Sequence, residues 1–407
     1  MALTVLTDEQ IRTILENLTR EEYAGFRESM ARTLHEYSTK NNQAPEEESY
    51  HQPHRVSTQN HTTGATTLYM PSCSPLGMGC KGKPTTSDQL ATFSLTYFVT
   101  LSSSDSAKPP IKPTGAITLL SPRGKPVGFV HAKTLTAFRT AAPSTCLLAR
   151  RSTVETITVF GSGLQAYWHV RLALLTRGSS VRHVNVIVRS LSDNAKSILA
   201  QFQDVPAHIR AREGWADTTF SLLASSHEAY PRLLCEQVCE ADVIFCCTPS
   251  REDLFNADIL TSREGSRKAR LVVAIGSYTP EMRELPEELL LQATKREGSQ
   301  LHFHKHEHAS DSGVIIVDTR DGILKEAGEV ISAGIQPSQM VELGELVEIL
   351  RQMESQEASK DASLAKWLRD GTVIYKSVGL GLMDLAVGMH LIKVAEEKGV
   401  GTRIDGF

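Results

Sequence analysis

A glycine-rich turn between an apolar strand and a helix constrains this chain more than any other feature of its sequence. Residues 156–160 (TITVF) are a short apolar run of the buried-strand type, and a helical segment, LQAYWHVRLALLTR, begins at 164. The residues at this junction have the spacing G-x-G-x-x-A and comprise Gly161, Gly163, Leu164, Gln165 and Ala166. The first glycine allows a tight turn, the second leaves room for a pyrophosphate, and the small alanine lets the helix pack closely on the strand. Because the free N–H groups at a helix start favour negative charge, we predict dinucleotide binding here, with a plain strand–helix turn as the alternative.

Strand and helix patterns alternate along the residues that follow this turn. The apolar runs VNVIVR, ADVIFCCT, LVVAIGS and GVIIVDT have strand length, and NAKSILAQF has a helical pattern. This alternation predicts an α/β fold with a doubly wound parallel sheet of the Rossmann type, which we place at residues 150–349.

The remaining parts of the chain have mixed patterns. Residues 1–35 and 133–150 have helical patterns, whereas 67–130 contains β-branched and aromatic runs separated by turns. We therefore expect residues 1–149 and 350–407 to form a second α/β domain.

The end of the second predicted strand of the Rossmann domain bears on which dinucleotide binds. NAD sites usually carry Asp or Glu there for the ribose 2′-hydroxyl, but this strand ends in Val188-Arg189-Ser190 and the next acid is Asp193. A guanidinium and a hydroxyl suit a 2′-phosphate. We therefore favour NADPH over NADH as the cofactor; the alternative is that Arg189 is a solvated charge and Asp193 reaches the ribose.

Three other segments hold candidate functional side chains. Arg139 lies in the small and apolar run LTAFRTAA, where a buried guanidinium needs an anion, either a substrate carboxylate or a partner in a structural salt bridge. Lys81 follows Gly79-Cys80 and would suit proton transfer in a partly apolar pocket, unless it is solvated. The turn YKSVG at 375–379 either faces a nicotinamide ring or is a structural crossover.

Neither the cysteines nor the histidines predict a metal site. The seven cysteines are scattered, and Cys235 and Cys239, four apart on a probable helix, have no second pair at zinc-site spacing. We interpret them as buried free thiols in a reducing compartment. The alternating histidines from His302 to His308 would lie on one side of an extended strand; we interpret them as a solvated loop rather than a Zn²⁺ or Ni²⁺ site.

Composition excludes several classes of partner. The 407 residues include 43 Lys+Arg and 47 Asp+Glu, a net charge of −4, so the chain has no bulk attraction to nucleic acid or to an anionic membrane. It has no run of about 18 apolar residues that would span a bilayer, and MALTVLTDEQIRTIL lacks the pattern of a secretory leader. We expect a cytoplasmic protein.

Taken together, these segments resemble the ornithine cyclodeaminase/mu-crystallin family. The resemblance runs from about residue 50 to 400, and LTAFRTAA, GSGLQA and KSVG are specific in combination. The shared pieces are Met70-Pro71, the lysine after glycine, LTAFRTAA at 135–142, GSGLQA at 161–166, ADVIFCCT at 241–248, AIGSYTPEMRE at 274–284, VDTRDGILKEAGE at 317–329 and YKSVGLGLMDLAVG at 375–388.

The resemblance implies a homodimer in which a Rossmann domain accompanies a substrate-binding and dimerisation domain. Family members move a hydride between a nicotinamide and the carbon that bears an amino or imino nitrogen. Carried over by position, Arg55, Arg139 and Met70 would bind the substrate, and Lys81 would be the acid/base group. The cofactor residues would be Thr140, Gly161, Gly163, Leu164, Gln165, Ala166, Arg189, Ser190, Thr248, Ser377 and Gly379.

Two departures from the family pattern bear on the reaction. Ornithine cyclodeaminases carry an Asp that engages the substrate amine, and Tyr278 stands at that position here. A phenol is uncharged near neutral pH and cannot pair with an ammonium, which disfavours ornithine cyclisation. Residues 82–88 also intervene between the lysine and the next strand, so Lys83 is an alternative to Lys81.

The sequence therefore predicts NADPH-dependent reduction of a cyclic ketimine or imino acid, a small-molecule substrate. One alternative is an ornithine cyclodeaminase or amino-acid dehydrogenase on the same scaffold. Another, of a different class, is a non-catalytic protein that binds NADPH and a small ligand.

Overall fold

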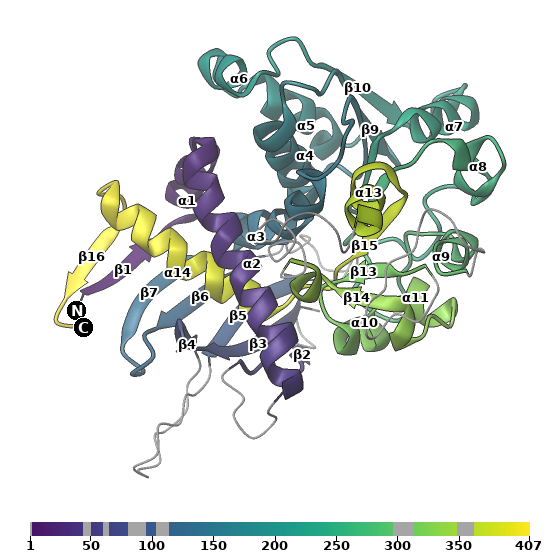
Figure 1. The fold of residues 1–407 in the computed structure, drawn as a ribbon. Helices are drawn as coiled ribbons and strands as arrows, with labels where there is room; N and C mark the ends of the chain where they lie inside the picture. The colour runs from purple at the N-terminus through teal and green to yellow at the C-terminus, as the bar shows by residue number, and fades with distance from the viewer. Residues whose placement is uncertain are drawn as a thin grey trace. The chain divides into compact units, whose positions relative to one another are not determined.

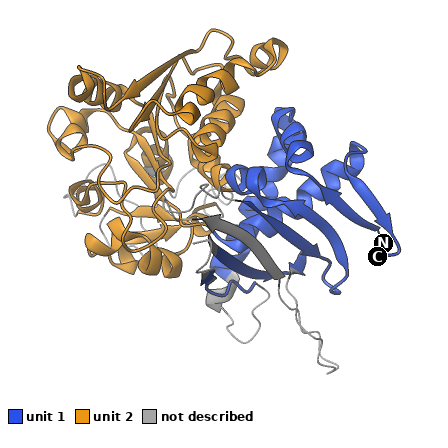
Figure 2. Ribbon diagram, turned by 180° about the vertical axis from the view of Figure 1, so that it is seen from behind, with its two compact units in different colours: residues 1–139, 380–407 blue, residues 140–379 orange. Residues whose placement is uncertain are grey.

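The computed structural model describes residues 2–43, 50–59, 65–79, 95–102, 114–295, 313–347 and 362–407. The chain divides into two compact units (Figure 2): unit 1 comprises Met1–Arg139 with Leu380–Phe407, and unit 2 comprises Thr140–Gly379. Lys81, Lys83 and the histidines from His302 to His308 lie outside the described residues. Over the described segments, no helix combines the length and the apolar character that crossing a bilayer requires.

Unit 2 is built on an eight-stranded sheet whose neighbouring strands are parallel. The strand order is β10-β9-β8-β11-β12-β15-β13-β14. Its first five strands follow the 3-2-1-4-5 order of the Rossmann fold, and the sixth position is taken by β15, the last strand of the sheet in chain order. The strands are β8 (Thr156–Phe160), β9 (His183–Val188), β10 (Thr219–Ala224), β11 (Val243–Cys246), β12 (Leu271–Ala274), β13 (Ile315–Val317), β14 (Met340–Glu342) and β15 (Val373–Lys376). The predicted doubly wound parallel sheet is confirmed.

Burial explains why these strands are apolar along their length. Every residue of β11, β12 and β15 is buried, as expected for a parallel sheet covered on both faces by helices. The helices of unit 2 are α4 (Leu164–Arg177), α5 (Asp193–Gln203), α6 (Ala207–Glu213), α7 (Tyr230–Glu240), α8 (Asp258–Thr261), α9 (Glu287–Ala293), α10 (Arg320–Glu326), α11 (Gly328–Ser332) and α13 (Ala362–Asp370). Since parallel strands end at one edge, the loops after β8, β11, β12, β13 and β15 lie where folds of this kind bind ligands.

Unit 1 has a mixed sheet with helices α2 and α14 lying across one face (Figure 1). The strand order is β16-β1-β7-β6-β4-β3-β2, and β5 pairs with β3 and β6. The strands are β1 (Ala2–Leu6), β2 (Val56–Gln59), β3 (Ala65–Ser74), β4 (Gly77–Gly79), β5 (Leu95–Ser102), β6 (Thr114–Leu120), β7 (Pro126–His131) and β16 (Thr402–Asp405), and the helices are α1 (Asp8–Glu16), α2 (Arg20–Gln43) and α14 (Gly381–Glu397). The boundary between the units falls within α3 (Ala132–Leu148). The expected second α/β domain is therefore present.

The first residues of the chain form a strand, so the predicted helix over 1–35 is wrong at its start. β1 pairs in parallel with β7 and antiparallel with β16. Those partners lie more than 120 and about 400 residues further along the chain, and the local pattern ALTVL carries no information about them.

The unit boundaries also differ from the predicted ones. Residues 350–379 were expected with the second domain, but β15 pairs with both β12 and β13 inside the unit 2 sheet. The chain returns to unit 1 only at Leu380, directly after the turn that follows β15.

Candidate functional site

The glycine-rich turn has the geometry that its spacing predicts. Gly161 has a φ of +112°, a region that favours glycine, and a Cβ there would lie 3.0 Å from the carbonyl oxygen of Cys247. Gly163 is the N-cap of α4, and a Cβ on it would meet nothing within 4 Å. The first glycine is therefore required by the fold, whereas the second lies beside open space.

The first turn of α4 fits a bound pyrophosphate. Its N-cap glycine has no side chain to cap the free N–H groups, and Ala166 is fully buried where the helix meets the sheet. The free N–H groups are donors that a phosphate would satisfy. The Oε1 atom of Gln165 is buried without a hydrogen-bond partner among the described residues and needs a donor, such as a hydroxyl group. The residues present fit a dinucleotide.

The end of β9 presents both groups that bear on the cofactor type. Arg189 and Ser190 are exposed directly after Val188, and Asp193 is exposed at the start of α5. Ser225 donates a hydrogen bond to the carbonyl oxygen of Arg189 over 2.6 Å, which fixes the backbone there and leaves the guanidinium at the surface.

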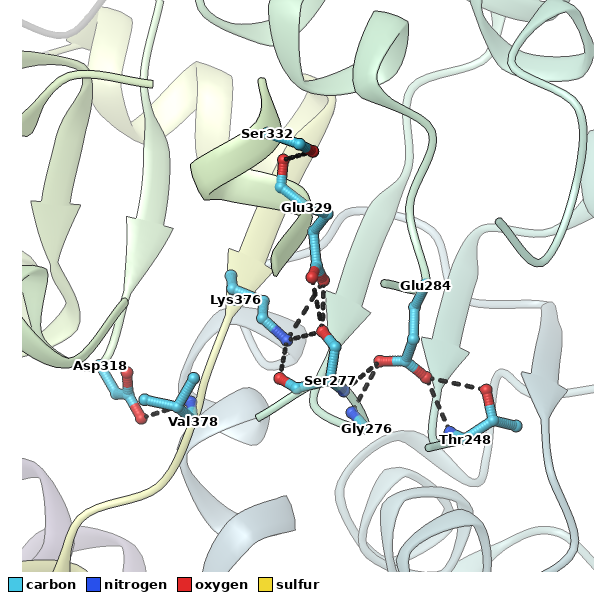
Figure 3. Close-up of polar contacts among 9 residues, drawn as sticks. All are labelled: Thr248, Gly276, Ser277, Glu284, Asp318, Glu329, Ser332, Lys376 and Val378. Atoms are coloured by element: carbon cyan, nitrogen blue, oxygen red, sulfur yellow. Dashed lines mark hydrogen bonds and ion pairs between the residues drawn. The ribbon is translucent and has the colours of Figure 1, made fainter. Parts of the chain in front are cut away.

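A buried carboxylate joins the loops after β11 and β12 (Figure 3). One oxygen of Glu284 accepts hydrogen bonds from the backbone N and Oγ1 of Thr248, at 2.7 and 3.1 Å. The other accepts from the backbone N atoms of Gly276, at 2.6 Å, and Ser277, at 3.3 Å. The two loops touch directly, since a Cβ on Gly276 would lie 2.1 Å from the carbonyl oxygen of Thr248. Glu284 thus fixes Thr248, a predicted cofactor residue.

A buried lysine lies beside this carboxylate. Lys376 ends β15 and donates to the carbonyl oxygen and Oγ of Ser277, at 2.7 and 2.6 Å, and its Nζ lies 3.2 Å from Oε1 of Glu329. Ser277 in turn donates to Glu329 over 2.6 Å. Lys376 and Glu329 are both 0% exposed, so they form an ion pair in the interior at the carboxyl edge of the sheet (Figure 3).

A third buried acid holds the turn after β15. Asp318 accepts hydrogen bonds from Oγ of Ser377 at 2.6 Å and from the backbone N atoms of Val378 and Gly379 at 3.0 and 2.7 Å. Burial raises the pKa of Asp318, opposed by these hydrogen bonds. Gly379 has a φ of +85°. The predicted cofactor residues Ser377 and Gly379 are therefore held in a defined turn.

The pKa of Glu284 gives unit 2 a specific dependence on pH. Burial raises this pKa from 4.5 to about 7, against the opposing charge of Lys376 and the hydrogen bond from Thr248. The native state therefore keeps a proton on Glu284 that the unfolded chain releases near pH 4.5. As a result, the free energy of unfolding that this group contributes is lost as pH rises from 4.5 through 7.

We expect the Tm of the wild type to fall by about 5–10 °C between pH 4.5 and 7 because of this group, and we expect Glu284→Gln to remove that fall. Thermal unfolding at several pH values tests it, with Glu264→Gln, an exposed glutamate, as the control; equal slopes in wild type and E284Q would contradict the assignment.

In unit 1, the structure pairs Arg139 with a protein carboxylate. Its Nε donates to Oδ1 of Asp384 over 2.9 Å, and Nη1 lies 3.6 Å from the sulfur of Met383. The side chains of Arg139 and Asp384 are 5% and 1% exposed. Of the two anions that the sequence allowed, the structural salt bridge is thus present, and a substrate would meet a guanidinium that already has a carboxylate on its Nε side.

A second arginine acts on the same carboxylate. Burial raises the pKa of Asp384 to about 6, and the positive charges of Arg139 and Arg55 oppose the shift. Met70 is buried in β3, and its carbonyl oxygen would lie 2.9 Å from a Cβ on Gly381, the first residue of α14. Arg139 and Arg55 therefore both act on Asp384 of α14, and Met70 lies beside the first residue of the same helix.

Sequence reasoning missed the buried charges that organise these loops. Four of them, Glu284, Asp318, Glu329 and Asp384, lie within segments that were used only to establish the family resemblance. The fifth, Lys376, lies in the turn at 375–379, which was singled out without assigning a role to the lysine. One signal was available, since Asp318 and Lys376 are charged residues at the end of apolar strand runs. Lys81, the predicted acid/base residue, lies outside the described residues, and Thr140 is buried in α3 at the start of unit 2.

The cysteine pair differs from the prediction in its burial. Cys235 and Cys239 are free thiols on α7, but Cys235 is exposed and Cys239 is half-buried. α7 lies at the surface and buries only Val238, so the expectation of two buried thiols is wrong. In the part of the chain that the structure describes, no group of three or more His, Cys, Asp or Glu side chains could hold a metal ion.

Comparison with known sequences finds relatives over about two thirds of the chain. No protein-family model matches it. An uncharacterized protein of Saccharomyces cerevisiae is 27% identical over 303 residues, 69% of this chain and 74% of that protein. A delta(1)-pyrroline-2-carboxylate reductase of Bacillus cereus is 25% identical over 69% of this chain and 71% of its own length, and the mouse ketimine reductase mu-crystallin is 25% identical over 66% of each.

Solved structures of similar fold cover nearly the whole chain. The delta(1)-pyrroline-2-carboxylate reductase of Thermococcus litoralis, solved with NADH and L-proline, has a TM-score of 0.65 at 18% identity and covers 98% of this chain and 99% of its own. A probable ornithine cyclodeaminase from Bordetella pertussis has a TM-score of 0.63 at 21% identity, over 98% and 100%. These structures show the fold. Together with the sequence relatives, they make this chain similar to proteins of the ornithine cyclodeaminase/mu-crystallin family.

Proposed function

We propose that this chain is an NADPH-dependent oxidoreductase that reduces a cyclic ketimine or imino acid to the cyclic amino acid. The observation that carries the proposal is the buried guanidinium of Arg139, held by Asp384 with Arg55 acting on the same carboxylate. Guanidinium groups are the side chains that best pair with a ligand carboxylate. Relatives named for the reduction of pyrroline-2-carboxylate and of ketimines support the substrate class.

Unit 2 is proposed to hold the cofactor along the carboxyl edge of its sheet. When bound, the nicotinamide supplies the hydride that the carbon of the C=N bond accepts. The protein's own contribution is to orient it, because Glu284 fixes Thr248 and Asp318 fixes the turn at 377–379. The proposed cofactor residues are Thr140, Gly161, Gly163, Leu164, Gln165, Ala166, Arg189, Ser190, Thr248, Ser377 and Gly379.

Unit 1 is proposed to bind the substrate. Arg139 and Arg55 hold its carboxylate, and Met70 lies against its apolar ring. Lys81 keeps the imine nitrogen protonated, which makes the neighbouring carbon a better hydride acceptor; Lys83 is the alternative proton donor. The substrate-binding and dimerisation role of this unit is part of the same proposal.

The proposal is tested by NADPH oxidation with a panel of five- and six-membered cyclic imino acids. We expect oxidation with at least one member of the panel and formation of the cyclic amino acid. Ammonia release from L-ornithine with catalytic NAD would instead identify the chain as an ornithine cyclodeaminase. Tyr278 disfavours that reaction, because a phenol cannot pair with the substrate ammonium.

Net reduction of NADP by an amino acid would identify the chain as an amino-acid dehydrogenase. NADPH binding, followed by fluorescence, without turnover of any panel member would assign a non-catalytic binding protein.

The preference for NADPH is tested at Arg189. Loss of one charge-assisted contact with the 2′-phosphate costs about 1.5–3 kcal/mol, so we expect Arg189→Ala to raise the KM for NADPH about 10- to 100-fold. The KM for NADH should change less than threefold, and Arg182→Ala, a change at the exposed amino end of the same strand, serves as the matched control. An unchanged ratio of the two KM values in R189A would mean that Asp193, not Arg189, sets the cofactor type.

A homodimer is proposed to form on the open face of the unit 1 sheet. On β7, Gly128 faces α14, where a Cβ would lie 2.9 Å from Ile392, so its neighbour Phe129 points to the opposite face, where it is 45% exposed. Ile404 of β16 is 40% exposed. Exposed apolar side chains of this size favour an interface between subunits. We expect a dimer by sedimentation and a monomer for Phe129→Glu, with Arg123→Glu in the preceding turn as the control; a monomeric wild type would refute the proposal.

A further inference from the structure

Asp384 has a carboxylate oxygen that no group in the described segments satisfies. Its Oδ1 accepts the hydrogen bond from Nε of Arg139, but its Oδ2 is buried and has no hydrogen-bond partner among the described residues. The side chain is only 1% exposed. A buried acceptor without a partner carries the full cost of its lost hydration, so a native structure that keeps one calls for an explanation.

The neighbouring polar groups are committed elsewhere. The amide of Gln52 accepts from the backbone N of Leu382 over 2.9 Å and donates to the carbonyl oxygens of Pro53 and Pro71, both over 3.2 Å. Nη1 of Arg139 lies against the sulfur of Met383. These hydrogen bonds of Gln52 and of Nη1 of Arg139 therefore go to groups other than Oδ2 of Asp384.

We propose that Oδ2 of Asp384 accepts a hydrogen bond from the nitrogen of the substrate, so that the Arg139–Asp384 pair recognises an α-imino or α-amino acid by both of its charges. The inference rests on the proposed function and extends it to a further substrate-binding residue. In such a substrate the carboxylate and the protonated nitrogen sit on the same carbon. A guanidinium bonded to a carboxylate presents the complementary pair of charges side by side, and the substrate nitrogen supplies the missing donor.

The charges around Asp384 agree with this role. Two positive charges act on Asp384, those of Arg139 in α3 and of Arg55 ahead of β2. From β3, the uncharged residues Met70 and Ser72 pack against Gly381 at the start of α14. With a pKa of about 6, Asp384 is ionised at neutral pH and able to accept the N–H.

The test compares two ligands that differ only in the ring nitrogen, pyrrolidine-2-carboxylate and cyclopentanecarboxylate. Their binding to the full chain is measured by calorimetry, beside the turnover of cyclic imino acids. We expect the wild type to prefer the nitrogen-bearing ring by about 10- to 100-fold. Asp384→Asn should lose that preference and keep its affinity for the carbocyclic acid, and Asp384→Glu should recover part of it.

A matched control separates recognition of the ring nitrogen from the loss of stability that follows when a buried ion pair is broken. Glu213 is the carboxylate of another buried ion pair, with Arg171 at 2.7 Å, and Glu213→Gln should keep the full preference. If D384N does not fold, the wild type alone still decides, because the preference should fade as pH falls through about 6. A preference that survives both D384N and acid pH overturns the inference even where the wild type reduces cyclic imino acids. A wild type that reduces none of them overturns the proposed function itself.

Discussion

Replacing Arg139 by alanine is expected to raise the KM for a cyclic imino acid at least tenfold and to destabilise unit 1. A charge-assisted bond to the substrate carboxylate contributes about 1.5–3 kcal/mol, which sets the lower bound on the change in KM. The same substitution leaves Asp384 buried without its partner, and breaking a buried ion pair costs about 3–5 kcal/mol of folding free energy. Steady-state kinetics and thermal unfolding measure the two effects separately.

The double variant Arg139→Ala with Asp384→Asn separates recognition from stability. It removes the uncompensated charge, so much of the lost stability should return while KM stays high. Arg171→Ala removes a similarly buried guanidinium from its pair with Glu213 and should lower Tm without changing KM for the folded enzyme. A near-normal KM in folded R139A would show that Arg139 is only the structural partner of Asp384, and the proposed carboxylate site would be lost with it.

Replacing Lys376 by methionine is expected to cause the largest loss of stability in unit 2. The variant leaves Glu329 and Ser277 in the interior without the cation that they share. The expected cost is about 3–5 kcal/mol, which corresponds to a fall in Tm of about 10 °C or more for a unit of this size. Thermal unfolding followed by circular dichroism measures it.

The exposed pair Lys393–Glu397 on α14 is the control for this prediction. Its two side chains are 71% and 62% exposed at 3.8 Å, so solvent screens the pair and Lys393→Met should cost about 1 kcal/mol or less. If K376M lowers Tm no more than K393M does, the buried ion pair does not stabilise the fold. Adding Glu329→Gln to K376M should recover part of the loss, because it removes the unpaired charge.

The fold of unit 2 could be predicted because its signals are local. The apolar run 156–160, the G-x-G-x-x-A spacing and the following helix each depend on neighbouring residues, and strand runs buried on both faces stay apolar throughout. Gly161 illustrates this, since its positive φ is a property of the turn itself. The turn at 375–379 could likewise be singled out from its glycine and its place after a strand.

The charged groups that organise the candidate site could not be predicted in the same way. Glu284 matters because it meets Thr248, 36 residues earlier, and Asp384 because it meets Arg139, 245 residues earlier. A sequence pattern shows that a residue is acidic but not which partner it finds. For the same reason the sequence left Arg139 with two anions to choose between.

The sequence by itself determined the fold class of unit 2, a Rossmann-type parallel sheet with a glycine-rich turn after its first strand, and it indicated a resemblance to a known family of oxidoreductases. Tertiary structure alone decided that Ala2–Leu6 is a strand, that β15 belongs to the sheet of unit 2, and that Arg139 already has a carboxylate partner. The physical reason is the range of the interactions. Turns and helix starts are set by dihedral angles and neighbouring hydrogen bonds, whereas strand pairing and buried ion pairs depend on segments that only the folded chain brings together.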